Sequence, residues 1–293
     1  MSLIRILFVG DLVGKAGRRV LEEHLDRLVD RRRIDFCIVN VENAADGMGV
    51  TPEIADELFG RGIHCLTSGN HIWDRREIRE YLRVERRLLR PANYPTDLPG
   101  SGLYAGETAA GVPVAVVNIM GRVFMPPVDD PFRIAADVVA EARRLAPLVF
   151  VDMHAEATSE KVALGWYLDG QVAAVVGTHT HVQTCDDRVL PAGTAYITDV
   201  GMTGPYDSVI GMEKEAVLSR FLNHTQARMT TARGDARLCA VVVEADPATG
   251  LATGIERLML YEGDAPLPVD RSPVGGGSGP PLREGGPPFP EDK

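Results

Sequence analysis

Cysteine is scarce in this chain of 293 residues and follows no regular spacing. The four cysteines, Cys37, Cys65, Cys185 and Cys239, include no C-x-x-C pair. Zinc knuckles and disulfide frameworks depend on recurrent cysteine spacings, so the sequence argues against both. Cys37 and Cys65 lie within apolar strand patterns, and we expect them to be reduced, buried thiols.

Long apolar runs are absent as well. No run approaches the roughly 18–20 apolar residues of a membrane span, and the N-terminus enters a strand pattern without the apolar region of a signal peptide. We therefore expect a cytoplasmic protein that does not contact a membrane.

Positive charge is in deficit, because the formal net charge is −10 at pH 7. Proteins that bind long nucleic acids nonspecifically rely on many Lys and Arg contacts to phosphate, so this class is disfavoured. A small anionic substrate is compatible with the charge, since a bound cation can dominate the electrostatic field of a site.

The composition favours a single folded domain. Hydrophobic residues make up 45% of the chain, which is enough for a substantial core. No internal repeat or Pro- and Gly-rich linker interrupts residues 1–263, so we expect one domain there. Residues 264–293 are rich in Pro and Gly with few apolar anchors, which predicts a disordered tail.

The N-terminal part of the chain predicts alternating strands and helices. Strand patterns cover residues 3–9, 34–41 and 63–68, and helix patterns lie between them. Thr51-Pro52 supplies an N-cap and a proline at the first position of the second helix. Connections of this length favour parallel strands, whose carboxyl ends are the usual ligand sites of such sheets.

The remaining residues continue this α/β pattern. The strand that begins at Val172 is followed by two histidines, and a Gly-rich loop over residues 201–208 is suited to closing over a site. We expect a charged helix over residues 75–89, a hairpin over 103–120, a helix over 131–145, a strand over 148–153, a helix capped by Thr158-Ser159, a strand over 195–200, a helix over 213–223, and a terminal hairpin pairing 238–244 with 254–260.

Side chains that can ligate metals recur where the predicted strands end. Mixed carboxylate, amide and imidazole groups suit Fe, Mn or Zn, and their number exceeds what one ion needs. Glu42 is the natural bridge between two ions about 3.5–4 Å apart, as in hydrolytic two-metal sites. Taken singly, each acid or Asn is better explained as a helix cap or turn residue, but the ensemble favours a metal site. The set is Asp11, Glu42, Asn43, Asn70, His71, His154, His179 and His181.

The order of these motifs resembles that of the calcineurin-like metallophosphoesterases. The matching motifs are Gly10-Asp11, Gly69-Asn70-His71, the isolated His154, and Gly177-Thr178-His179-Thr180-His181. Two features depart from that superfamily: Val13 stands where the first motif usually has His, and Glu42-Asn43 replaces the bridging Asp of the second. Both departures, together with the phrases at residues 41–47 and 198–206, resemble the YmdB-like branch.

This resemblance covers nearly the whole chain up to the tail, and it implies both a fold and an activity. The fold would be a calcineurin-like αββα sandwich with mixed sheets and a dimetal site at the C-terminal ends of the strands. The activity would be that of a 2′,3′-cyclic-nucleotide phosphodiesterase, acting on a small nucleotide phosphodiester with iron, or iron and manganese; zinc is not excluded. Matched by motif, one ion would be held by Asp11, Glu42, Asn43 and His181, and the other by Glu42, Asn70, His154 and His179.

His71 matches no ligand position and is the candidate general acid. It would protonate the leaving ribose oxygen while an activated water attacks phosphorus in line, a contribution of roughly 10²–10⁴-fold. The alternative is a hydrogen bond that orients the neighbouring Asn70. The family resemblance favours the catalytic role.

Other polar residues give weaker signals. Asn43 and Tyr206 are tentative substrate contacts, and stacking of Tyr206 on a base is about as compatible with the sequence as a structural loop role. Glu156, Thr180 and Asp199 are candidates for supporting the ligands. We expect His24 and His224 to be exposed and His64 to be a core or sheet residue.

Other functions are compatible with the same residues. A phosphomonoesterase or nuclease would use the same site; the acidic charge weighs against a long-polymer nuclease, although Arg75, Arg76 and Arg79 could form a local basic groove. A regulatory protein that binds a nucleotide with little turnover is the alternative from another class. RNA ends are a further candidate substrate, and a homo-oligomer is expected on base rates alone.

Overall fold

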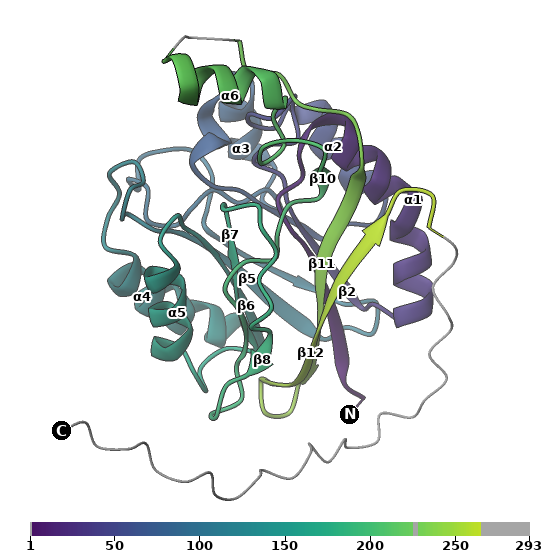
Figure 1. Cartoon of the computed structure of the whole chain (residues 1–293). Helices are drawn as coiled ribbons and strands as arrows, with labels where there is room; N and C mark the ends of the chain where they lie inside the picture. Colours follow the sequence, from purple (N-terminus) through teal and green to yellow (C-terminus); the bar gives the residue numbers. More distant parts are fainter. Residues whose placement is uncertain (1, 225–227, 265–293) are drawn as a thin grey trace, which may run out of the picture.

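Two six-stranded mixed sheets form the centre of the protein in this computed structural model, and helices cover their outer faces (Figure 1). The structure describes residues 2–224 and 228–264, so the predicted tail beyond residue 264 lies outside the described residues. The predicted α/β sandwich with mixed sheets is confirmed.

The first sheet contains the three N-terminal strands, which are parallel to one another as predicted. The predicted terminal hairpin joins the same sheet, with its first arm antiparallel to the first strand. The strands are β1 (Ile4–Val9), β2 (Phe36–Asn40), β3 (Cys65–Thr67), β10 (Gly204–Pro205), β11 (Ala236–Asp246) and β12 (Leu251–Tyr261), in the order β10-β11-β1-β2-β3 with β12 also paired to β11.

The second sheet has four parallel strands flanked by an antiparallel strand at each edge. Its order is β4-β5-β6-β7-β9-β8. The strands are β4 (Leu103–Glu107), β5 (Pro113–Met120), β6 (Leu148–His154), β7 (Ala174–Thr178), β8 (Arg188–Val189) and β9 (Ala195–Ile197).

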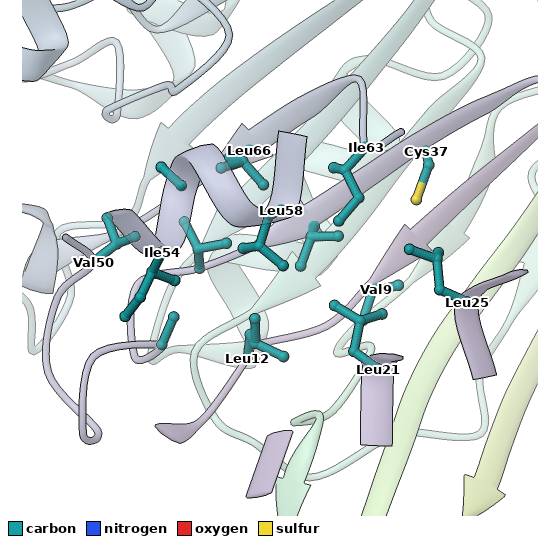
Figure 2. Packing of buried hydrophobic residues seen from close by; sticks show 14 of the residues in the cluster. Val9, Leu12, Leu21, Leu25, Cys37, Val50, Ile54, Leu58, Ile63 and Leu66 are labelled. Atoms are coloured by element: carbon teal, nitrogen blue, oxygen red, sulfur yellow. The ribbon is translucent and has the colours of Figure 1, made fainter. Parts of the chain in front are cut away.

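Alternation along the strands divides the core into layers. Successive side chains of a strand point to opposite faces, so Phe8 of β1 faces the second sheet, where its ring stacks on Phe150 with centroids 5.4 Å apart. Leu7 and Val9 face the other way, into the cluster that packs against α1 (Gly14–Arg32) and α2 (Pro52–Gly60) (Figure 2).

The other helices lie near the predicted positions, apart from one predicted N-cap and one predicted helix that is shorter than expected. The predicted cap of α2 is confirmed, because the Thr51 side chain accepts from the Ile54 backbone N. The helix starting at Thr158 has Ala157 at its N-cap and no side-chain cap, so the predicted Thr158-Ser159 cap is wrong. The helices are α3 (Ile78–Val84), α4 (Pro131–Leu145), α5 (Thr158–Tyr167) and α6 (Lys214–Asn223), with a 3-10 helix η1 (Asn70–Trp73).

The charged helix predicted over residues 75–89 is much shorter in the structure. The chain after α3 runs beside β3, where Leu66 N donates to Arg87 O and Leu89 N donates to Leu66 O, both at 2.8 Å. These bonds hold the backbone around Leu88 in an extended conformation, so pairing with the sheet overrides the local helix propensity.

The expectations for the cysteines and for membrane-spanning segments can be compared with the structure. Cys37 and Cys65 are buried and free, as expected, and burial raises the pKa of the Cys37 thiol to about 12. Within residues 2–224 and 228–264, no helix is both long and apolar enough to cross a bilayer.

Candidate metal centre

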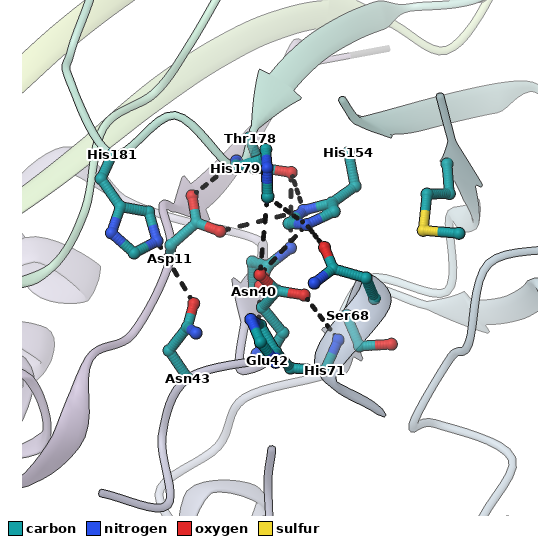
Figure 3. A network of polar contacts seen from close by, with 12 residues as sticks. Asp11, Asn40, Glu42, Asn43, Ser68, His71, His154, Thr178, His179 and His181 are labelled. Carbon is teal, nitrogen blue, oxygen red and sulfur yellow. Dashed lines mark hydrogen bonds and ion pairs between the residues drawn. The ribbon is translucent and has the colours of Figure 1, made fainter. Parts of the chain in front are cut away.

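The two sheets bring their strand ends together at one end of the molecule. Asp11 and Glu42 follow β1 and β2 of the first sheet, whereas His154 ends β6 and His179 follows β7 of the second. Figure 3 shows these side chains pointing toward one another from opposite sheets. Parallel strands place their carboxyl ends on a common edge, which explains why residues distant in sequence meet here.

One cluster gathers around the carboxylate of Glu42. His154 Nε2 lies 3.0 Å from Glu42 Oε1 and 3.2 Å from Asn70 Oδ1. His179 Nδ1 lies 3.1 Å from His154 Nε2 and 4.0 Å from Glu42 Oε1. Ligand atoms of Glu42, His154 and His179 all fall within 4.8 Å of one another, a convergence that suits a single cation.

A second group lies beside it, around Asp11 and Asn43. His181 Nε2 is 3.3 Å from Asn43 Oδ1. Asp11 is fully buried; its Oδ2 accepts from the His179 backbone N at 3.2 Å, whereas its Oδ1 has no hydrogen-bond partner within the described residues. A buried carboxylate oxygen without a partner is costly, and a cation would satisfy it, so these residues fit the implied metal.

The charges at the site also fit a cation. Burial raises the pKa of Asp11 to about 8, and repulsion from Asp199 and Glu42 adds to this shift. Burial opposes ionisation of Glu42 too, yet attraction from His154 holds the pKa of Glu42 well below its ordinary range. Carboxylates crowded into a dry site repel one another, and a metal ion would reverse this penalty.

Hydrogen bonds fix which imidazole nitrogen faces the site. The Thr178 hydroxyl donates to Asp152 Oδ1 at 2.7 Å, so its oxygen accepts from His154 Nδ1 at 2.9 Å. His181 Nδ1 lies 2.9 Å from the Ile210 carbonyl, which can only accept. Each ring therefore carries its proton on Nδ1 and presents the Nε2 lone pair to the cluster.

Burial keeps these two rings neutral, as ligands must be. It lowers the pKa of His154 to about 4, against the pull of Glu42, and it also lowers the pKa of His181. Neutral imidazole is the form that binds metal, so neither ring has to lose a proton near neutral pH.

The backbone at the two neighbouring histidines differs from the prediction. Extended backbone would have pointed His179 and His181 to one side, but their φ angles are 97° and 64°, in the left-handed region. The rings consequently serve different groups, His179 beside His154 and His181 beside Asn43. This conformation is costly for non-glycine residues, and the intervening Thr180 is tied down by its N and Oγ1, which both donate to Asp199 Oδ2.

Two supporting residues were not singled out by the sequence. Asp152 lies inside β6 and looks like a strand residue, but its Oδ2 also accepts from Asn40 Nδ2 and Thr67 Oγ1, at 2.9 and 2.6 Å. Lys161 lies on α5 and is fully buried, with Nζ 2.7 Å from Asp199 Oδ2. In the sequence, the signals that could have pointed to these roles were the position of Asp152 within an apolar strand and the isolation of Lys161 in a chain with few lysines.

His71 lies at the margin of the cluster. Its backbone N donates to Glu42 Oε2 at 3.2 Å, and its side chain is 30% exposed. Its Nδ1 is 2.7 Å from Asp74 Oδ2, a contact that fixes the ring from outside. The imidazole is thus both anchored and accessible to a ligand.

Of the weaker candidates, Glu156 contacts the cluster directly, with Oε2 3.0 Å from His179 Nε2. Tyr206 is engaged elsewhere: its hydroxyl contacts Met202 O at 3.2 Å and Cys239 Sγ at 2.9 Å, and the Arg237 guanidinium lies over its ring. These contacts favour a structural role for Tyr206 over stacking on a base.

The histidines outside the motifs show one error of prediction. His24 is buried, and its Nε2 contacts Tyr261 O at 2.9 Å, so the expected exposure is wrong. The helix α1 packs against β11 of the terminal hairpin, and the end of β12 reaches the ring through Tyr261 O, so the hairpin covers a side chain that the charged sequence context suggests is solvated. His64 was expected in the core or the sheet; it lies one residue before β3 and is half-buried, with its ring stacked on Phe36 and its Nδ1 accepting from Cys37 N at 3.0 Å. His224 is exposed, as expected.

Comparison with known proteins agrees with this architecture. A 2′,3′-cyclic-nucleotide 2′-phosphodiesterase of Bacillus subtilis is 49% identical over 259 residues, which cover 88% of this chain and 98% of the relative. A crystal structure of a hypothetical protein from Thermus thermophilus is 42% identical, with a TM-score of 0.82 and coverage of 88% of this chain and 99% of that one.

A crystal structure described as that of a novel phosphatase, from Mycoplasma pneumoniae, is 33% identical with a TM-score of 0.83, covering 89% of this chain and 95% of that one. The family model for YmdB-like proteins matches residues 7–258. The resemblance seen in the motifs is confirmed, and the chain belongs to the family of YmdB-like proteins.

Proposed function

We propose that this protein is a metal-dependent phosphodiesterase that hydrolyses small phosphodiesters, above all 2′,3′-cyclic nucleotides. The observation that carries the proposal is the convergence of Glu42, His154 and His179 from two sheets, beside a buried Asp11 oxygen that has no hydrogen-bond partner among the described residues. The name of the Bacillus subtilis relative supports the substrate class.

The ligand sets follow the two groups of side chains. Glu42, Asn70, His154 and His179 would hold one ion, and Asp11, Asn43 and His181 would hold the other, with Glu42 shared. Two such ions supply Lewis acidity toward phosphodiester oxygens and acidify a water molecule near neutral pH. Mixed oxygen and nitrogen ligands suit iron, or iron with manganese, and zinc is an alternative.

His71 would act as the general acid. The Asp74 carboxylate, 2.7 Å from His71 Nδ1, would hold the ring in place and leave Nε2 to deliver the proton. That proton would pass to the ribose oxygen as its bond to phosphorus breaks, giving a nucleoside monophosphate. The 30% exposure of the side chain leaves room for the leaving group.

The test is hydrolysis of 2′,3′-cyclic AMP by protein loaded with iron or manganese, beside a generic aryl phosphodiester. Glu42→Ala should lose both metal content and turnover. His71→Ala should keep its metal but lose about 10²–10⁴-fold in kcat on the cyclic nucleotide. The loss should be smaller on an aryl diester, whose leaving group needs no proton. A fully metallated wild type that is inert toward both diesters would overturn the proposal.

Phosphomonoester hydrolysis is the second candidate, because the related Mycoplasma pneumoniae structure is described as a phosphatase. The same ions and His71 would serve both reactions, so parallel assays with 3′-AMP decide between them. A nucleotide-binding regulator would instead bind 2′,3′-cyclic AMP at the metals with little turnover. Cytoplasmic location and a homo-oligomeric state stay predictions.

A further inference from the structure

A basic cavity of about 660 Å³ adjoins the loops that carry the candidate metal ligands. Its lining includes Lys15, Arg19, Arg75, Arg228 and Arg233, against only two acidic residues. This local excess of positive charge stands out in a chain whose formal net charge is −10. Its volume lies within the roughly 300–1,000 Å³ typical of small-ligand pockets.

The cavity and the metal centre share structural walls. Gly14, at the start of α1, donates its backbone N to Asn43 O at 3.0 Å, and Gly47 N donates to the same oxygen at 3.0 Å. Thr231 lines the cavity and lies so close to Gly47 that an added Cβ would be 2.7 Å from its methyl carbon. The same loop, residues 43–47, begins with Asn43, whose Oδ1 lies 3.3 Å from His181 Nε2.

Two further connections join the cavity to the site. Met212, in the cavity wall, follows two residues after Ile210, whose carbonyl fixes His181. Arg75 follows η1, which carries His71, and its guanidinium donates to Ala45 O and to Met48 O. Arg75 thus braces the loop. It contributes to the cavity together with distant segments of the chain, whereas Arg79 lies over Trp73 and, like Arg76, does not line the cavity.

Three of the cations are available to a ligand. Arg19 is paired with Glu262, and Arg75 is held by backbone carbonyls. Within residues 2–224 and 228–264, in contrast, no acidic group pairs with Lys15, Arg228 or Arg233. The N-terminus of α1 adds to their field, since its first turn contains no acidic residue and no side chain caps it.

We propose that this cavity binds a phosphate of the substrate other than the one being hydrolysed. The preferred substrate would then be a nucleotide with a phosphate beyond its cyclic one, as at the end of a short RNA strand that terminates in a 2′,3′-cyclic phosphate. This inference rests on the proposed function. The basic cavity attracts one additional phosphate, whereas the negative net charge of the chain repels a long polyanion. We therefore expect short strands to be preferred over long ones.

The test compares two substrates of the metal-loaded full chain: 2′,3′-cyclic AMP, and the dinucleotide ApA bearing a terminal 2′,3′-cyclic phosphate. Wild type should show kcat/KM about tenfold or more higher for the dinucleotide, and added salt should reduce this advantage. Lys15→Ala, Arg228→Ala and Arg233→Ala should each lower kcat/KM for the dinucleotide by roughly 3–10-fold, and leave 2′,3′-cyclic AMP unchanged. Arg83→Ala, on α3 and lining a different cavity, is the matched control and should change neither rate.

Each other outcome identifies which idea fails. Equal rates on both substrates that none of the variants alters would overturn the cavity assignment and leave the phosphodiesterase proposal intact. Variants that change the 2′,3′-cyclic AMP rate as much as the dinucleotide rate would also overturn it, in favour of an effect on the metal centre itself. No turnover of either substrate by metal-loaded wild type would overturn the proposed function and this inference with it.

Discussion

Lys161 and Asp199 form a fully buried ion pair directly behind the two histidines of the Thr178–His181 segment, with Nζ and Oδ2 2.7 Å apart. The same Asp199 oxygen accepts from the Thr180 backbone N at 3.1 Å, and Asp199 Oδ1 accepts from Gly201 N at 2.7 Å. The pair therefore holds in place a segment whose backbone is unfavourable on its own.

Breaking this pair should be strongly destabilising. Lys161→Met leaves the Asp199 charge buried without its partner, and we expect a loss of about 3–5 kcal/mol in the free energy of unfolding. Lys214→Met is the control, because Lys214 pairs with Asp207 on the surface, where solvent screens the pair, and the variant should lose little stability. Urea unfolding followed by circular dichroism measures both. Similar losses for the two variants would contradict the assigned role of the buried pair.

The hydroxyl of Thr178 should tune metal binding through His154. Thr178→Val removes the oxygen that fixes the proton on His154 Nδ1, and we expect metal affinity to fall about 10–100-fold. Thr194→Val is matched in chemistry and burial, but its hydroxyl bonds to Val172 O and Leu168 O away from the site. Metal titration by calorimetry should separate the two; equal affinities in Thr178→Val and wild type would contradict the prediction.

Gly69 should tolerate no side chain. A Cβ at this position would lie 2.1 Å from His154 Cδ2 and 2.3 Å from Glu42 Oε2, so Gly69→Ala must displace two candidate ligands. We expect the variant to lose metal content and phosphodiesterase activity together. Gly60→Ala is the control, since a Cβ there meets nothing within 4 Å. Elemental analysis of both purified proteins is the measurement, and a Gly69→Ala variant with full metal content would show that the site can rearrange.

Asp130 should make the stability of α4 depend on acidity. Its carboxylate caps the helix by accepting from Phe132 N and Arg133 N, and mainly the Arg133 bond lowers the pKa of Asp130 below 3.8. A depressed carboxylate pKa gives stability that is present above the unfolded value of 3.8 and is lost as pH falls through the lower folded value.

Two substitutions isolate this effect. Asp130→Ala should cost about 0.5–2 kcal/mol at pH 7, whereas Asp130→Asn keeps a capping oxygen and should cost much less. On acidification below pH 4, wild type should lose its advantage over Asp130→Asn, as followed by thermal unfolding at each pH. A wild-type advantage that persists at low pH would show that the carboxylate charge plays no part.

The positions of the candidate ligands could be predicted because strand ends are visible in the sequence. The apolar runs that end at Asp11, Glu42 and His154 fix these residues to a common edge, whatever the details of the loops. The sequence cannot tell which side a ring faces once the backbone leaves the strand. The left-handed His179 and His181 flank Thr180, which is held by tertiary bonds to Asp199, 19 residues further along the chain.

Other misses have the same origin. The burial of His24 depends on the Tyr261 carbonyl of β12, and the shortened α3 depends on pairing of Leu88 with Leu66. Both contacts join segments whose proximity is decided by the sheet topology. The local sequence pattern describes each element in isolation, so it cannot show where a tertiary contact changes the burial or length of that element.

The candidate ligands are divided between the sheets, with Asp11, Glu42 and Asn70 on one and His154 and His179 on the other. Neither sheet can therefore complete the site by itself, and ions bound there would link the two sheets across their interface. Metal binding would raise the free energy needed to separate the two sheets. A change that weakens the packing between the sheets would lower metal affinity by the same free energy. The candidate metal centre would thus also stabilise the packing of one sheet on the other.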